Sequence, residues 1–347
     1  MLRIVMGMVM SINANVGVAN EPSRVANPIV KGVHYIGATV SNLNNSRDIY
    51  QASADLQPVT SAKVENDPWL DRLAGRSGVK VSTQLMKSVN AQLNLMQFAR
   101  PSAEAKQYSA VAVAGPGIAH VCYHIAKSTG AYEKFLQLGA TVMGARDMVK
   151  FNEEGPMSYA YVKDKDGLIL EIEQVDVEAL NPEKSLKHDY RIRHIALSTP
   201  NIDKAVAFYS TLLETTNPSR AGDLTPHSGE KFDQVTGLTG TAIEMAWFQI
   251  RNLELEIVQY HSYKTELPSK PRPIDAIGYN AIVFDVTDLT AAKKKLLEAG
   301  GTLVKTPKNV MDKSIFYGRD LDGNLLGFQI LANDSPYSSQ NFEDNGI

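Results

Sequence analysis

The sequence has only one cysteine, Cys122, and no run of 18 apolar residues. A single cysteine excludes an intrachain disulfide and a cysteine-based zinc site, and the missing apolar run excludes a membrane-spanning helix. The formal charge of −3 provides no basic excess for nucleic acid or an anionic membrane. No glycine-rich phosphate loop, Ser-His-Asp elbow or cysteine nucleophile stands out. Any metal ion must therefore be held by His, Asp, Glu, Gln, Tyr or backbone groups.

The 347 residues are 44% hydrophobic and 21% charged, which is typical of a soluble globular protein with room for two domains. We interpret residues 1–29 as a disordered extension. Alternatively, Arg3, the apolar stretch 4–12 and Gly17-Val18-Ala19 resemble a weak signal segment. The expected location is therefore cytoplasmic, with export as the alternative. Residues 333–347 are polar and predict a frayed tail.

An internal repeat relates the two halves of the chain. Residues 71–98 align without a gap with residues 233–260, and both segments predict two strands joined by a turn. Asn90 and Asn252 fall at these turns, where asparagine tolerates positive φ. The expected strands are 80–87 and 92–98 in the first copy, and 241–250 and 254–260 in the second. The matched residues are Asp71, Gly75, Gly78, Asn90, Leu93 and Gln97, which meet Asp233, Gly237, Gly240, Asn252, Leu255 and Gln259.

A second repeat lies further along each half. Residues 131–142 resemble residues 291–304, and each segment predicts a helix, a glycine at its end and a strand. Downstream, the D-x-D-G run from Asp164 to Gly167 matches the run from Asp320 to Gly323. Both runs predict a turn that leads into an apolar strand.

Strand-then-helix openings complete four copies of a βαβββ module. Modules one and three are alike, and so are modules two and four, so a two-module unit at 30–176 was duplicated as a second unit at 190–332. The segment 177–189, which carries Asn181-Pro182, is the expected linker. The expected modules are 30–100, 115–176, 190–262 and 275–332.

This pattern resembles the vicinal-oxygen-chelate superfamily of glyoxalases, bleomycin-resistance proteins and extradiol dioxygenases. The carrying segments are residues 194–209, in which His194 opens a strand and Phe208-Tyr209 end a helix, and residues 164–172, which run from the D-x-D-G turn into a strand. The resemblance covers about 300 residues. It implies an α+β fold in which the four modules form two open, cup-shaped barrels. It also implies that metal ligands come from the first and last strand of each module.

The implied ligand positions are unevenly filled. Modules two and three each offer a histidine and a glutamate, whereas the outer modules offer residues that ligate weakly or not at all. The first-strand positions are Tyr35, His120, His194 and Ala281, and the last-strand positions are Asn94, Glu171, Glu256 and Gly327.

Two pairings of the modules are open. If sequence neighbours pair, one cup holds Tyr35, Asn94, His120 and Glu171, and the other holds only His194 and Glu256. If module two pairs with module three, one cup holds His120, Glu171, His194 and Glu256, and the other is empty. We favour this exchanged pairing because it explains why the losses fall on the outer modules. Two histidines and two carboxylates suit zinc, nickel, manganese, cobalt or iron(II).

Further residues are candidates for substrate contacts or for supporting the ligands. Glu173 and Gln329 lie two residues beyond their ligand positions on the same strand face. Arg193 should point away from His194 by strand alternation. A β-bulge could turn His34 inward to form a dioxygenase-like triad with His120 and Glu171. The remaining candidates are Tyr35, Asn94, Tyr159, Tyr161 and His227, the last of which falls in a long polar loop at 217–233.

The resemblance implies a metal-dependent lyase or isomerase of the glyoxalase type. The substrate would be a small molecule with a hydroxyl and a carbonyl on adjacent carbons, and Glu171 or Glu256 would act as the base. The alternatives are an extradiol-type or other iron(II) dioxygenase and a metal-free protein that sequesters a small molecule. Expected partners are the substrate and, as a candidate assembly, a second copy of the chain; neither nucleic acid nor a membrane is expected.

Overall fold

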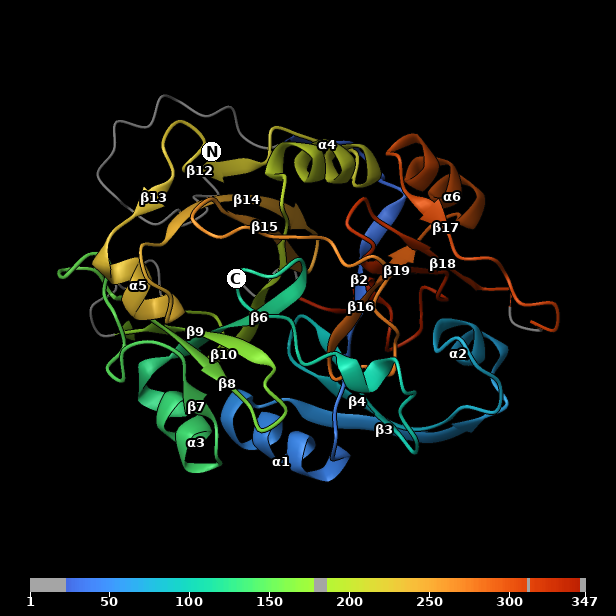
Figure 1. The fold of residues 1–347 in the computed structure, drawn as a ribbon, viewed down its shortest axis with the longest axis horizontal. Helices are drawn as coiled ribbons and strands as arrows, with labels where there is room; N and C mark the ends of the chain where they lie inside the picture. Colours follow the sequence, from blue (N-terminus) through green and yellow to red (C-terminus); the bar gives the residue numbers. More distant parts are fainter. Residues whose placement is uncertain (1–22, 178–185, 311–312, 344–347) are drawn as a thin grey trace.

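The computed structural model describes residues 23–177, 186–310 and 313–343, in which two mixed β-sheets form the core (Figure 1). The expected α+β class is confirmed. Most of the predicted N-terminal extension, the centre of the predicted linker and the last four residues lie outside the described residues. No helix among the described residues is long and apolar enough to cross a membrane.

The helices and strands, grouped by expected module, follow in chain order. Module one contains β2 (Val30–Thr39), α1 (Leu43–Ala54), β3 (Gln57–Glu65), α2 (Pro68–Leu73), β4 (Lys80–Lys87) and β5 (Gln92–Phe98). Module two contains β6 (Gly117–Ala126), α3 (Ala131–Gln137), β7 (Thr141–Val142), β8 (Met157–Lys163) and β9 (Ile169–Val175). Module three contains β10 (Tyr190–Ser198), α4 (Ile202–Leu212), β11 (Thr215–Thr216), β12 (Ser219–Ala221), β13 (His227–Ser228), α5 (Glu230–Thr236), β14 (Ala242–Ile250) and β15 (Leu253–Tyr260). Module four contains β16 (Gly278–Val286), α6 (Leu289–Glu298), β17 (Thr302–Leu303), β18 (Ile315–Arg319) and β19 (Leu325–Gln329). Outside the modules lie β1 (Ser23–Arg24) and the short 3-10 helices Ala105–Gln107, Lys127–Thr129 and Ser339–Asn341.

The matched residues of the repeat make the same contacts in both copies. Asp71 accepts hydrogen bonds from the backbone N–H groups of Gly78 and Val79, as Asp233 does from those of Gly240 and Thr241. The four matched glycines all have φ between 67° and 71°, a region that glycine enters at little cost. The side chains of Gln97 and Gln259 accept from the first N–H groups of α1 and α4.

The strand order answers the question of module pairing. One sheet runs β12-β14-β15-β10-β6-β9-β8-β7 and joins modules three and two; the other runs β17-β18-β19-β16-β2-β5-β4-β3 and joins modules four and one. Each sheet is joined at its centre by an antiparallel pair of first strands, β10 with β6 and β16 with β2. The expected units 30–176 and 190–332 therefore do not each form one sheet. Each sheet instead combines one module from the first unit with one from the second.

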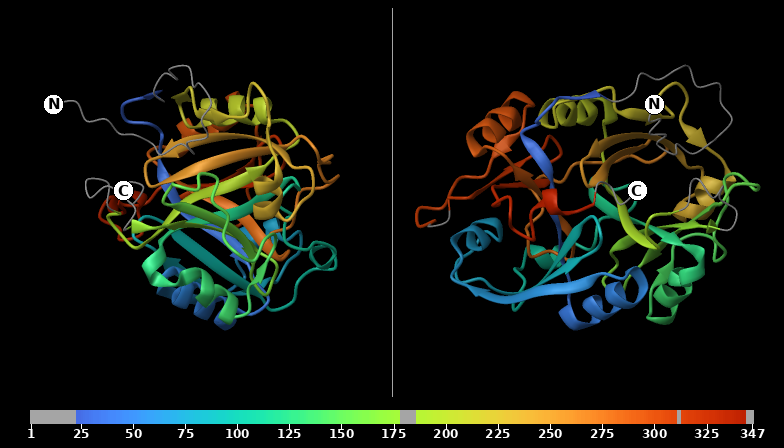
Figure 2. Two further views of the ribbon diagram at one scale, coloured as in Figure 1. Left: turned by 90° about the vertical axis from the view of Figure 1, so that its left-hand side faces the viewer. Right: turned by 180° about the vertical axis from the view of Figure 1, so that it is seen from behind.

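Sequence neighbours meet instead through their helices. Helix α1 contacts α3, and α4 contacts α6, on opposite sides of the molecule (Figures 1 and 2). The hydroxyl of Tyr50, near the end of α1, donates to Asp164 of the first D-x-D-G turn at 3.1 Å. Tyr209 of α4 donates to Asp320 of the second such turn at 2.7 Å. The repeated tyrosine and aspartate thus tie each module to its neighbour in sequence.

Asn90 and Asn252 do not have the positive φ that the turn position suggested. Both side chains are fully buried and link the two sheets. The Asn252 amide accepts from the Val33 N–H at 2.8 Å and donates to the carbonyls of Val33 and Asn90 at 3.0 and 2.8 Å. Asn90 makes the equivalent bonds to Ile192 and to the carbonyl of Asn252. These backbone groups are buried, so they need partners from the opposite sheet.

We expect Asn252→Ala to lower the free energy of unfolding by about 2–4 kcal/mol, because it leaves three buried backbone groups without a partner. Urea denaturation of the variant and the wild type measures the difference. Asn45→Ala, an exposed substitution on α1, is the matched control and should change stability by less than about 0.5 kcal/mol. A loss no larger than that of the control would contradict the linking role.

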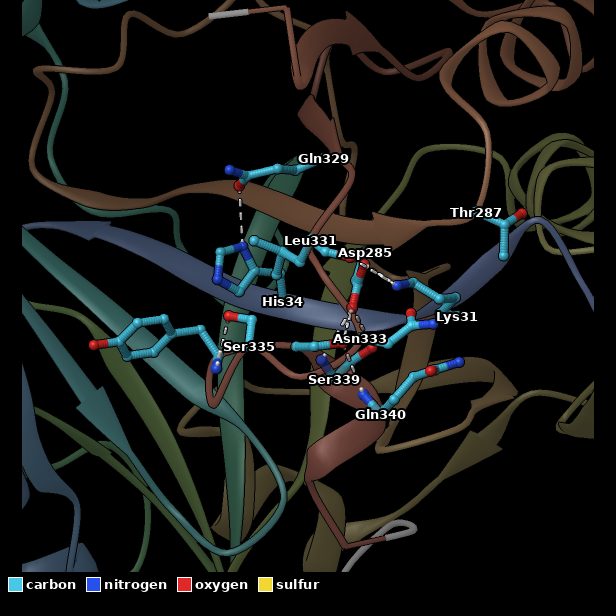
Figure 3. A network of polar contacts seen from close by, with 12 residues as sticks. Lys31, His34, Asp285, Thr287, Gln329, Leu331, Asn333, Ser335, Ser339 and Gln340 are labelled. Carbon is cyan, nitrogen blue, oxygen red and sulfur yellow. Dashed lines mark hydrogen bonds and ion pairs between the residues drawn. The ribbon is translucent and has the colours of Figure 1, made fainter.

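The predicted polar tail is not frayed over residues 333–343. Ser338 and Ser339 are fully buried and Phe342 is nearly so. Asp285 on β16, itself buried, accepts hydrogen bonds from the hydroxyls of Ser338 and Ser339 and pairs with Lys31 at 2.9 Å (Figure 3). A buried carboxylate needs hydrogen-bond donors, and these serines supply them. The polar residues of this segment are therefore part of the packed structure.

Candidate metal centre

Four side chains converge in the cup formed by modules two and three. His120 lies on β6 and His194 on β10, the antiparallel pair at the centre of this sheet. Glu171 lies on β9 beside β6, and Glu256 lies on β15 beside β10, both in parallel register. Each module therefore contributes one histidine from its first strand and one glutamate from its last. All four residues are buried.

The four donor atoms lie at the spacing of a metal coordination shell. His120 Nε2 lies 3.3 Å from His194 Nε2 and 3.2 Å from Glu171 Oε2. His194 Nε2 lies 2.9 Å from that same oxygen, and Glu256 Oε2 lies 3.4 and 3.3 Å from the two imidazole nitrogens. A tetrahedron with ligand bonds of 2.0–2.1 Å has edges of about 3.3 Å. These five separations are close to that value, and all four donor atoms lie within 4.8 Å of one another, so they can surround one divalent ion.

The charges of the cluster also fit a cation. Burial lowers the pKa of His120, but the carboxylates of Glu171 and Glu256 outweigh it and raise this pKa to about 9. Burial raises the pKa of Glu171, but hydrogen bonds from both histidines hold it well below its usual range. Two carboxylates and two imidazole nitrogens therefore attract positive charge to one point. A divalent ion would satisfy all four donors at once.

The outer nitrogens of both imidazoles have no protein acceptor among the residues that the structure describes. Nδ1 of His120 and Nδ1 of His194 are buried without a hydrogen-bond partner in the described ranges. The ring of His120 instead packs against that of Tyr161, with centroids 5.0 Å apart. Packing, not a carboxylate behind the ring, orients these two candidate ligands, whereas histidines at metal sites usually donate their second nitrogen to an acceptor.

Arg193 does not point away from the cup, contrary to the expectation from strand alternation. The register of β10 against β6 shifts between Ile192 and His194, so Arg193 is the extra residue of a β-bulge. Its guanidinium bonds to Glu173 on β9, and its Nε lies 3.2 Å from Glu254 on β15. Both partners share the strand face of the candidate ligands. Glu173 therefore pairs with a cation beside the four-donor cluster.

The cup is lined mainly by aromatic and aliphatic side chains. The candidates Tyr159 and Tyr161 line it, and so do Tyr260 and Glu254, which the sequence did not single out. Tyr260 lies four residues after Glu256 and Glu254 lies two before it, so all three share one face of the strand. This spacing is the sequence signal that could have identified both residues. The other apolar lining residues are Phe151, Phe232, Val235, Ile243, Met245, Trp247 and Val258.

His227 is not brought to the cluster. The predicted loop 217–233 contains β12, β13 and the first residues of α5, and His227 lies on β13. Its ring stacks on that of Phe232 with centroids 6.0 Å apart. His227 thus contacts a residue that lines the cup but does not line the cup itself.

The cup of modules one and four holds no comparable donor set among the described residues. Tyr35 and Asn94 lie there and hydrogen-bond with each other. The bulge suggested for His34 exists, but its Nδ1 meets the Gln329 side chain at 3.2 Å, in a different sheet from His120 (Figure 3). This separation rules out the dioxygenase-like triad. A Cβ at Gly327 would lie 2.9 Å from Val283, so this cup is filled by packing. Its apolar cluster includes Leu73, Val81, Met96, Ile274, Ala281, Val283 and Leu325.

Known proteins share both the sequence pattern and the fold. The family model of the Glyoxalase/Bleomycin resistance protein/Dioxygenase superfamily matches residues 191–328. Glyoxalase I from Zea mays superimposes with a TM-score of 0.57 at 13% identity, over 89% of this chain and 93% of that one. A putative dioxygenase from Bacillus subtilis gives a TM-score of 0.55 at 13% identity, over 92% and 90%. No match is found among curated proteins.

Four βαβββ modules in two open cups define the class of vicinal-oxygen-chelate proteins, and the solved structures share this fold. Residues 191–328 match the glyoxalase/bleomycin-resistance/dioxygenase superfamily, and the fold of nearly the whole chain is that of the solved glyoxalase I and dioxygenase structures.

Proposed function

We propose that this protein is a divalent-metal-dependent enzyme that moves a proton on a small molecule with a hydroxyl and a carbonyl on adjacent carbons. The observation that carries the proposal is the convergence of His120, Glu171, His194 and Glu256 in one buried, largely apolar cup. The four residues would hold a zinc, nickel, manganese, cobalt or iron(II) ion. Such an ion would polarise the substrate carbonyl and make the neighbouring carbon-bound proton more acidic.

The donor set favours this chemistry over oxygen activation. Iron(II) oxygenases typically use two histidines and one carboxylate, which leaves positions open for oxygen and substrate. Here a second carboxylate, Glu256, completes a four-donor set. The metal-free alternative is disfavoured because two buried carboxylates would then face two imidazoles with no more than protons to neutralise them.

Glu256 is the better candidate for the base. Its Oε2 lies 3.3–3.4 Å from the two imidazole nitrogens, whereas that of Glu171 lies 2.9–3.2 Å from them. The less tightly held carboxylate can reorient toward a substrate carbon at lower cost. Glu171 and the two histidines would then keep the ion in place while Glu256 takes up and returns the proton. The apolar wall of Met245, Trp247 and Val258 would exclude water around it.

We expect Glu256→Gln to slow carbon–hydrogen exchange about 10²- to 10⁴-fold while most of the metal stays bound. The assay follows exchange of hydroxyacetone and dihydroxyacetone protons in deuterium oxide by NMR, with metal-loaded protein. Glu133→Gln on the exposed surface of α3 is the control and should match the wild type. Oxygen uptake with a catechol would favour the dioxygenase alternative. Unchanged exchange in Glu256→Gln would contradict the assignment of the base.

A further inference from the structure

A second cavity, with a volume of about 290 Å³, lies where β6 and β16 begin. Its walls come from the segment 107–118, from the approach to β16 around Arg272 and from the turn between β18 and β19. It shares no lining residue with the cup that holds the four donors. The two cavities are therefore distinct, and none of the proposed chemistry uses this one.

Arg272 is held rigidly at the wall of this cavity. Its Nε donates to Asn280 Oδ1 at 2.9 Å, and its Nη2 donates to the carbonyls of Ser109, at 2.8 Å, and Ile277. Asn280 is fixed in turn, because its amide donates to two backbone carbonyls. The guanidinium also lies over the ring of Tyr108, 5.2 Å from its centroid. These contacts leave Nη1 without a protein acceptor in the described part of the chain.

Arg319 presents a second guanidinium to the same cavity. Its Nη1 donates to the carbonyl of Gly323 at 2.7 Å, and this is the one hydrogen bond of its side chain among the described residues. Burial lowers the pKa of both arginines, to about 10 for Arg272. Partly buried guanidinium groups are normally paired with a carboxylate. In residues 23–177, 186–310 and 313–343, neither arginine forms such an ion pair.

The carboxylates near the cavity are engaged elsewhere. Glu266 lines the cavity but pairs with Lys264 at the surface. Burial disfavours the charged form of Asp322 and raises the pKa of its carboxyl to about 6, and the nearby Thr199 hydroxyl offsets part of this rise. Asp320, which interacts electrostatically with Arg319, accepts from the Tyr209 hydroxyl and the Asn324 amide. The groups that can still form hydrogen bonds at this cavity are thus N–H donors of two guanidinium groups.

We propose that this cavity is a second ligand site, which binds a small molecule through an oxyanion, either a carboxylate or a phosphate. The planar donors of Arg272 and Arg319 match the oxygens of such a group. The Asn324 side chain lines the same space and offers a further hydrogen bond. The ligand would sit at the junction of the two cups, next to the first residues of the strand that carries His120.

Calorimetric titration of the metal-loaded protein with inorganic phosphate and, separately, with malonate tests this site at constant ionic strength. We expect saturable binding of at least one anion, weakened about 10- to 100-fold in Arg272→Gln and in Arg319→Gln with metal content unchanged. Binding of phosphate alone identifies a phosphate ligand, and binding of malonate alone identifies a carboxylate. Arg47→Gln, which removes an exposed arginine of α1, should bind like the wild type.

Ala112→Trp provides a second variant that leaves both arginines in place. Ala112 is exposed and lines the cavity, so a bulky side chain there should block it without unfolding the protein. This variant should also lose anion binding by at least about 10-fold. The proposal is overturned if the wild type binds neither anion, or if binding persists in both arginine variants, as it would for an anion on the metal of the cup.

Discussion

His120→Ala and His194→Ala should each reduce the bound divalent metal from about one ion per chain to less than about a tenth of that. The two histidines come from different halves of the sequence, but their Nε2 atoms lie 3.3 Å apart. A single ion would therefore need both, because the two histidines and Glu171 are the ligands that would keep it in place, and alanine offers no donor atom in place of the imidazole. Elemental analysis of gently purified protein measures the metal directly, and a thermal melt with and without a chelator measures its contribution to stability.

His188→Ala is the control, because this histidine is partly exposed and lies outside the cluster. It should keep its metal. The two cluster variants should lose the same ion, so the double variant should hold about as little metal as either single one. Retention of about one ion in either single variant would contradict a shared site. Two ions in the wild type, each lost in only one variant, would contradict it as well.

The local part of this candidate site could be predicted from the sequence, because each inner module encodes its own histidine and glutamate. His120 with Glu171 and His194 with Glu256 follow from strand patterns and turns within one module. The sequence favoured one pairing of the modules without deciding between the two, because the pairing depends on contacts between β10 and β6, which lie far apart in the chain. Either pairing leaves the local patterns unchanged.

The residues that join the modules were harder to interpret. Asn90 and Asn252 were visible as a repeat, but their turn position favoured a local backbone role over a bond to the opposite sheet. Asp285 and Ser338 show the same difficulty, because a polar tail is typical of a frayed end unless a buried carboxylate requires its hydroxyls. Such partners are specified by tertiary structure and leave no periodic signal.

The bulge at Arg193 was missed for a related reason. Strand alternation assigns faces correctly only while the register is continuous, and one extra residue reverses the assignment. No glycine or proline marks the position in the sequence. Two glutamates on the inner face, Glu173 and Glu254, were the available signal, because buried carboxylates require a cation.

Arg193→Met should lower the free energy of unfolding by about 3–5 kcal/mol, a large part of the stability of an ordinary domain. The substitution keeps much of the side-chain volume but leaves Glu173, which is 2% exposed, without its cation. Glu254 loses the same partner, and Glu171 and Glu256 add two further carboxylates to the cup. Urea denaturation of metal-loaded protein measures the loss.

A second substitution separates lost charge pairing from lost packing. If Arg193 acts as the counter-ion of Glu173, the double variant Arg193→Met with Glu173→Gln should be more stable than Arg193→Met alone, because the uncompensated charge is removed. If Arg193 acts only by filling space, the second substitution should give no recovery. Because Arg193 lies next to His194 in the chain, metal content is measured on the same samples. A loss of stability that persists at equal metal content assigns the effect to the ion pairs of the cup.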